Sequence, residues 1–119
     1  MKIYQKTNFD TFEEFQRFVE HSPYLSPEER SMIVSHEKDH YQECLIRGYS
    51  ATFNFHRTHI QIGRLIIYSI VGASVNINPR QRVSLNDLEA ITSAPKNLGW
   101  GDKINLYLIK LIKPWFKTI

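Results

Sequence analysis

Two histidines four residues apart flank a glutamate in the segment His36-Glu37-Lys38-Asp39-His40. If this segment is helical, residues four apart lie on the same side of the helix, so both imidazoles can reach one metal ion. Zinc suits neutral imidazole ligands, and a catalytic zinc site keeps one position for a water whose pKa falls to about 7. Glu37 is then placed to accept the proton of that water as it attacks a carbonyl. The spacing therefore predicts a zinc centre with His36 and His40 as ligands and Glu37 as the general base.

The sequence on either side of the histidines predicts one long helix over residues 27–47. Ser26 is followed by Pro27 and, three residues after the serine, by Glu29, which together make a capping box with proline at the first helical position. At the other end, Arg47 complements the negative end of the helix dipole, and Gly48 can adopt the left-handed conformation that ends a helix. The helix is thus predicted from its two ends, independently of the histidines between them.

Over residues 33–48 the chain resembles the zincin metallopeptidases, whose active-site helix carries the same His-Glu-x-x-His pattern. The resemblance implies hydrolysis of a peptide or protein substrate, and a third zinc ligand that lies downstream of the helix and can be an aspartate. The chain departs from the family at Lys38 and Asp39, where zincins usually carry uncharged residues. It also departs in element order, because the family's helix normally follows its sheet, whereas the predicted strands here come after the helix.

A zinc ion that keeps one position for water needs a third protein ligand. Asp102 is the first candidate, since it lies downstream and follows Gly101 in a glycine-flanked loop; its alternative role is the N-cap of a last helix. His56 and His59 are the next candidates, although the pattern around them favours exposed histidines at a hairpin turn, and Glu89 is the last. Glu43 is expected to be a hydrogen-bond partner that supports His40, or else a solvated surface residue.

Length and composition are those of one ordinary globular domain. The 119 residues, of which 42% are apolar and 23% charged, can bury a single core, so one compact domain is expected over residues 1–119. The net charge of +3 is too small to indicate a nucleic-acid-binding protein. The single cysteine, Cys44, excludes an internal disulfide. Residues 1–5 lead into polar sequence and not into the apolar core of a signal peptide, so a cytoplasmic location is expected. The apolar run over residues 65–75 is too short to be a transmembrane segment.

Hydrophobic patterning predicts an α+β fold. From position 51, apolar and polar residues alternate as in strands, with turns expected at residues 57–59 and 72–74. We expect two N-terminal helices, the second of which carries the histidines, a small antiparallel sheet of two to three strands, and two C-terminal helices. The expected helices cover residues 12–20, 27–47, 84–93 and 103–112.

Three functional hypotheses follow. The first is a small zinc hydrolase acting on a peptide or another amide, and the second is a domain that binds zinc without catalysis. The third is an interaction module that uses residues 104–119, where apolar residues accompany lysines spaced seven apart and Pro114 is expected to interrupt the helix. Such a basic amphipathic helix can lie on a membrane surface or in the groove of a partner. The residues concerned are Lys103, Leu108, Lys110, Leu111, Ile112, Trp115, Phe116 and Lys117.

Overall fold

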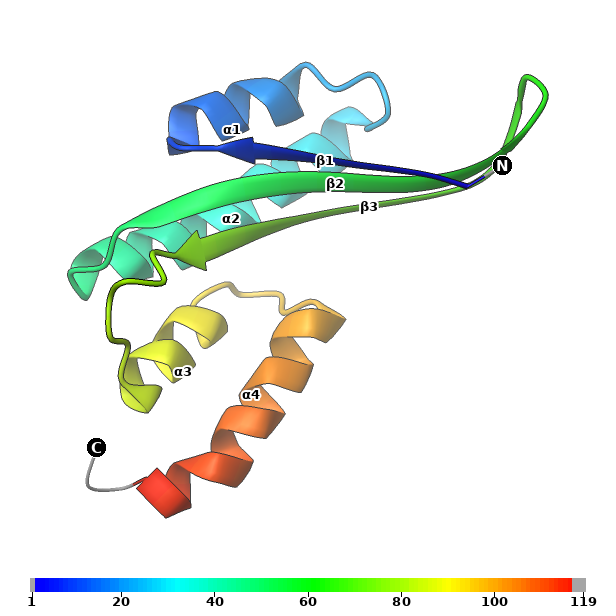
Figure 1. Cartoon of the computed structure of the whole chain (residues 1–119). Helices are drawn as coiled ribbons and strands as arrows, with labels where there is room; N and C mark the ends of the chain where they lie inside the picture. The colour runs from blue at the N-terminus through cyan, green and yellow to red at the C-terminus, as the bar shows by residue number, and fades with distance from the viewer. Residues whose placement is uncertain (1, 117–119) are drawn as a thin grey trace.

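The computed structural model describes residues 2–116. This part of the chain forms three β-strands, four α-helices and a final 3-10 helix (Figure 1). The arrangement is of the α+β class that the sequence predicts. In chain order the elements are β1 (Lys2–Phe9), α1 (Phe12–Glu20), α2 (Pro27–Ile46), β2 (Ala51–Ile62), β3 (Leu65–Ile77), α3 (Leu85–Ser93), α4 (Trp100–Ile112) and η1 (Lys113–Phe116).

The strands make one antiparallel sheet in the order β1-β2-β3. The sequence pattern does not predict β1, which pairs with β2 along its whole length and precedes the helices, so the strands do not all follow α2. β2 and β3 are long and continuous, and they are joined at Gly63, whose φ of 59° is a left-handed conformation that glycine adopts readily. The turns predicted at residues 57–59 and 72–74 are wrong, because both segments continue as paired strand.

Local capping signals set the starts of the first three helices. Thr11 accepts a hydrogen bond from the backbone of Glu14 at the start of α1, and Ser84 caps α3 in the same way. α2 has the complete capping box, in which the Ser26 side chain and the Glu29 side chain each bond the backbone of the other residue. The predicted boundaries of these helices are confirmed to within one residue.

The last helix begins earlier than the sequence predicts. Its N-cap is Gly99, which offers no side-chain bond, and Trp100 is its first residue. Asp102 therefore lies inside the first turn, so its alternative role as the N-cap is wrong. A carboxylate in the first turn still complements the positive end of the helix dipole.

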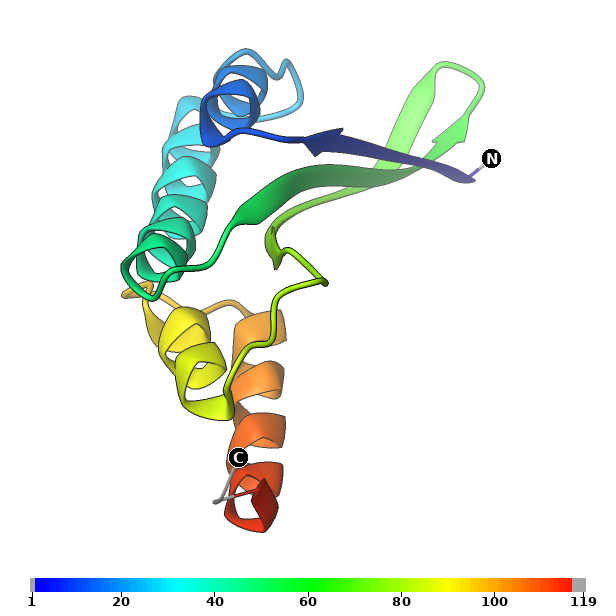
Figure 2. The ribbon, with the colours of Figure 1, turned by 60° about the vertical axis from the view of Figure 1, so that its left-hand side comes forward.

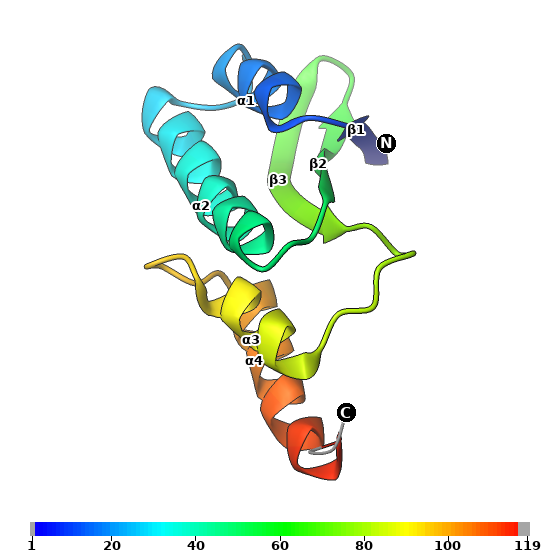
Figure 3. The same cartoon turned by 90° about the vertical axis from the view of Figure 1, so that its left-hand side faces the viewer.

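The main core lies between the sheet and the two N-terminal helices. α1 and α2 cover one face of the sheet (Figure 3), and Phe15 and Phe53 are fully enclosed between these layers with their rings stacked 5.7 Å apart. Phe18 of α1 lies at the margin of this core and is 38% exposed. The buried cluster consists of Phe12, Phe15, Val19, Leu25, Phe53 and Phe55.

α3 and α4 lie side by side beyond the end of this layered part (Figures 1 and 2). Arg47, just after α2, pairs with Asp87 of α3 at 2.8 Å, and the Tyr49 hydroxyl also donates to Asp87. α4 ends before Pro114, which lies in η1, as expected for proline; Lys117 lies outside the described residues. Within residues 2–116, none of the helices is both long and apolar enough to cross a membrane.

Candidate metal centre

Three side chains that can bind a metal converge between α2 and α4. The helical spacing of four places His36 and His40 on the same side of α2, and the first turn of α4 presents Asp102 to them. Asp102 Oδ2 lies 2.8 Å from His36 Nε2 and 3.3 Å from His40 Nε2, and the two histidine nitrogens are 3.2 Å apart. The first-ranked candidate for the third ligand thus lies beside the two histidines, although it is more than sixty residues away in sequence.

The orientation of His40 leaves its Nε2 as the atom that can bind a metal. Its Nδ1 lies 2.7 Å from the backbone carbonyl oxygen of Ile91, in the last turn of α3. A carbonyl only accepts, so Nδ1 carries the proton and donates, and in the neutral imidazole the lone pair is then on Nε2. Metal-bound histidines characteristically have such a partner for the second nitrogen. The sequence gives no sign of this contact, except that the last turn of any helix has carbonyls without helical partners.

The spacing of the three donor atoms suits a small metal ion. Zinc bonds of about 2.0–2.1 Å in a tetrahedral arrangement separate neighbouring ligand atoms by about 3.3 Å. The separations here are 2.8, 3.2 and 3.3 Å, so one ion could contact all three atoms with little movement. Two imidazole nitrogens and a carboxylate oxygen are a donor set that zinc accepts, and no fourth such donor joins them among residues 2–116.

Glu37 lies beside this cluster, in the wall of the same cleft. It is only 5% exposed, and its Oε2 is buried with no hydrogen-bond partner among the described residues. Burial, with a further contribution from the negative charge of Asp102, raises the pKa of the Glu37 carboxyl from 4.5 to about 8. A carboxyl poised near neutral pH is suited to general acid and base chemistry. A cation bound nearby would favour its charged form and lower that pKa.

Two clefts meet at the cluster, and His36 and Glu37 line both of them. One has a volume of about 640 Å³ and lies against residues 73–77 of β3, with Asn105 of α4 also in its wall. The other has a volume of about 580 Å³ and is bounded by Met32 of α2 and by the loop before α4. Both volumes are within the range of about 300–1,000 Å³ that is typical of ligand pockets.

The other candidates for the third ligand lie apart from the cluster. His56 is on the sheet face away from α1 and α2, where its ring lies so close to Gly72 that a Cβ there would clash with it. The partner of Phe55 on β3 is Ala73, which lines both clefts. His59 is on the helix-covered face but four residues further along β2 than Phe55, which is about 13 Å at 3.3 Å per residue. Glu89 forms an ion pair with Lys113 at 3.5 Å.

Two expectations about these residues are corrected. His56 and His59 are not exposed histidines of a turn, because β2 runs through both, and His59 is buried. Glu43 is not a hydrogen-bond partner of His40: its carboxylate is bonded to Arg47 at 2.9 Å, one helical turn further along.

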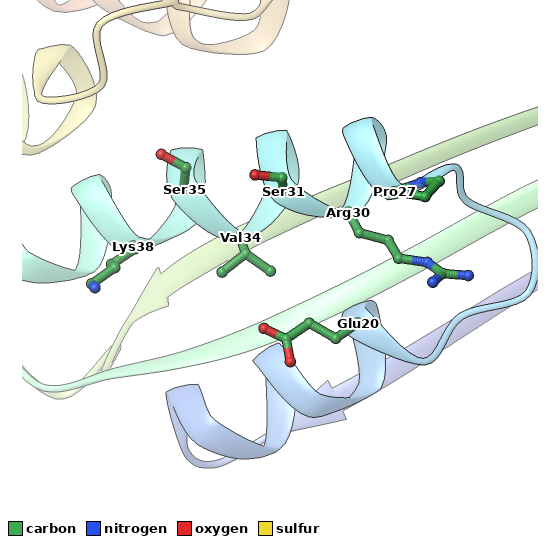
Figure 4. A pocket seen from close by; sticks show the side chains of 7 residues that line it. All are labelled: Glu20, Pro27, Arg30, Ser31, Val34, Ser35 and Lys38. Atoms are coloured by element: carbon green, nitrogen blue, oxygen red, sulfur yellow. The ribbon is translucent and has the colours of Figure 1, made fainter.

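The charged residue Lys38, which departs from the usual zincin pattern, lies on a different side of α2 from the histidines. It lines a separate pocket of about 480 Å³, together with Val34 and with Glu20 of α1 (Figure 4). Asp39 lines the cleft of about 580 Å³. The lysine therefore leaves the donor atoms of the cluster unobstructed.

Comparisons with protein-family models, with curated proteins and with solved structures find no match for this chain.

Proposed function

We propose that the protein is a zinc-dependent hydrolase that cleaves peptide bonds or similar amides. His36, His40 and Asp102 hold the zinc ion, and Glu37 is the general base. These roles are the ones that the resemblance to zincins implies for the two histidines and the glutamate. The ligand set leaves one position free, which is the arrangement of catalytic and not of structural zinc sites.

One observation carries the proposal. Donor atoms from α2 and α4 converge to within 3.3 Å of one another, next to a buried glutamate whose Oε2 has no partner among residues 2–116. Burying a carboxyl group without a hydrogen-bond partner lowers the stability of the fold. Such groups are found mostly at functional sites. A cation at the cluster would place positive charge beside the carboxyls of Asp102 and Glu37.

The chemistry divides between the metal and Glu37. A bound zinc ion lowers the pKa of water to about 7 and polarises the carbonyl of a substrate. Glu37 accepts a proton from the attacking water as the new C–O bond forms. It then delivers this proton to the amide nitrogen as the C–N bond breaks, which returns the carboxylate to its starting state.

A peptide in extended form suits the surroundings of the cluster. β3 is at the edge of the sheet, and its residues 73–77 line one of the clefts. An edge strand has backbone N–H and C=O groups that can pair with an added strand. The two clefts offer room on both sides of the reacting bond, because they meet at His36 and Glu37.

The test is to compare Glu37→Gln with Glu43→Gln, which lies on the same helix but is bonded to Arg47. Each zinc-loaded protein is incubated with a mixed library of quenched fluorescent peptides, and its zinc content is measured. We expect Glu37→Gln to keep zinc and to lose at least about 100-fold in hydrolysis rate, whereas Glu43→Gln keeps both. If Glu37→Gln hydrolyses as fast as the parent, or loses its zinc, the role given to Glu37 is wrong.

A second candidate function is a non-catalytic zinc-binding domain. It is favoured by the position of the cluster, because an ion there would tie α4 to α2 in a part of the molecule where α3 and α4 extend away from the sheet (Figure 2). Structural zinc commonly contributes to folding in this way. The same experiment separates the two, since a structural site predicts bound zinc with no hydrolysis in the parent protein.

A further inference from the structure

The side of α4 that faces solvent carries a continuous apolar stripe. Trp100, Ile104, Tyr107 and Leu111 follow one another at intervals of four, three and four residues, which places them along one line of a helix. Their exposed fractions are 81%, 55%, 64% and 51%, and Trp115 in η1 is 85% exposed. We call these five residues the α4 stripe. The sequence pattern indicates an amphipathic segment here, and the structure leaves its apolar side uncovered.

The stripe is not an unfilled part of the core. The opposite side of α4 is the one that packs, because Ile109 is buried there and Asp102 reaches the histidines from it. Single exposed apolar residues are common on protein surfaces, but a contiguous row of large ones is unusual and marks an interaction site.

The charge around the stripe has one sign. Lys103 and Lys110 lie seven residues apart along one flank, and neither forms an ion pair with any residue in the part of the chain that the structure describes. From Trp100 to residue 116 the only acidic residue is Asp102, which lies on the packed side. The exposed side of this segment is therefore apolar and basic, with no carboxylate to balance it.

We propose that the α4 stripe and its lysines bind the surface of an anionic lipid bilayer, with α4 parallel to the membrane plane. A helix that combines aromatic residues on one side with lysines beside them suits the interface between headgroups and acyl chains. A second copy of the chain is a poorer occupant. Stripes packed face to face would bring rows of lysines together without any carboxylate to pair with them.

The chain offers a direct readout of this binding. Its two tryptophans, Trp100 and Trp115, are both in the stripe, so the whole tryptophan emission reports on this face. The probe is large unilamellar vesicles of phosphatidylcholine with phosphatidylglycerol, compared with vesicles of phosphatidylcholine alone. We expect the emission to move to shorter wavelength, and the protein to sediment with the vesicles, only when the anionic lipid is present. Added salt should release it, because screening weakens the attraction.

Matched variants test the contribution of the lysines. Each basic residue near an anionic membrane contributes about a fivefold change in binding, so the double variant Lys103→Gln, Lys110→Gln should bind about 25-fold more weakly. The control is Lys6→Gln, Lys38→Gln, which removes the same charge from exposed positions on β1 and α2 and should bind like the parent. A further variant, Ile104→Gln, removes apolar area from the stripe and should also weaken binding, while circular dichroism confirms that each protein is folded.

Three results would overturn the proposal. The first is no sedimentation with anionic vesicles, and the second is equal weakening by the two lysine variants. The third is a blue shift that develops with protein concentration in the absence of lipid, together with a doubled mass in sedimentation equilibrium, which would identify a second copy as the occupant. Zinc content is measured in parallel and should be unaffected by these variants, so failure here is distinguishable from failure of the zinc site.

Discussion

The two parts of this molecule are held together in different ways. The sheet with α1 and α2 encloses a cluster of aromatic and aliphatic side chains, in which Phe15 and Phe53 are at most 1% exposed. α3 and α4 contact this part through several polar groups, namely the Asp87 contacts, the bond from His40 to the Ile91 carbonyl, and Asp102 beside the histidines. The apolar surface of α4 meanwhile lies mostly in solvent.

This difference bears on the proposed zinc site. Apolar packing is non-directional and gives stability, whereas polar contacts need defined partners and change strength with protonation and with bound ions. The donor atoms of the candidate zinc site lie at the polar junction, on one helix from each part. Zinc binding is therefore expected to strengthen the contact between the two parts more than it strengthens either part alone.

The largest effect is expected from removing a core aromatic side chain. Phe15→Ala should lower the free energy of unfolding by about 3–5 kcal/mol, because it leaves a cavity in the enclosed cluster. Trp100→Ala removes a larger side chain from the solvent-exposed stripe and should change that free energy by no more than about 0.5 kcal/mol. Urea unfolding of both variants measures this contrast, and equal losses would show that the two parts do not differ as described.

The next effect concerns zinc affinity. Asp102→Ala should weaken zinc binding by more than about 100-fold, which exceeds the loss typical of residues that only support a ligand. Asp102→Ser should not restore it, because Gly99 and not Asp102 is the N-cap, and serine is a poor zinc ligand. Glu89→Ala serves as the control and should bind zinc like the parent. A competition titration with a chromophoric chelator measures all four proteins; tight binding by the serine variant would move the ligand role to another residue.

Zinc should also stabilise the fold, and unevenly. At a free zinc concentration of about 100 times Kd, mass action adds about 2.7 kcal/mol to the free energy of unfolding, and a chelator should reverse this. Amide hydrogen exchange should slow more in α3 and α4 than in β1 and β2, since the ion joins α4 to α2. Uniform protection across the chain would mean that the junction is not the part that zinc strengthens.

The smallest effect is expected at the ionic contact between Arg47 and Asp87. Hydrogen bonds from Tyr49, and then from Arg47, lower the pKa of Asp87 below its usual value of 3.8. A lowered pKa in the folded state stabilises the protein above the unfolded pKa, and this contribution is lost as pH falls through the folded value. Asp87→Asn should therefore lower the Tm slightly at pH 7, and the difference from the parent should close below about pH 4. A difference that persists at pH 2 would contradict this assignment.

The parts of the fold that were predictable from sequence are those set by neighbouring residues. Ser26 and Glu29 lie three residues apart, so the start of α2, and with it the placement of His36 and His40 on one side, follows from local chemistry. The same holds for Thr11 and Ser84. These signals need no knowledge of the rest of the chain.

The errors arise where distant residues decide the structure. The polar residues 57–59 suggest a turn, yet they continue β2, because β1 and β3 pair with them on both sides and the Arg57 guanidinium packs 3.5 Å above the Tyr24 ring. β1 forms through its pairing with β2, so its own residues do not predict it as a strand. Asp102 was accessible as a candidate from its residue type and downstream position, but its approach to His36 depends on the packing of α4, which no local signal contains.

The central claim is that one metal ion joins the two parts of the molecule at His36, His40 and Asp102. The most direct test is the zinc content of the untagged protein, measured by elemental analysis after dialysis. The parent is compared with His36→Ala and His40→Ala. The control is His21→Ala, which removes an exposed histidine of the α1–α2 turn. We expect about one zinc per chain in the parent and in His21→Ala, and almost none in the two site variants. Parent protein that lacks zinc after growth in zinc-replete medium, or site variants that keep it in full, would contradict the account.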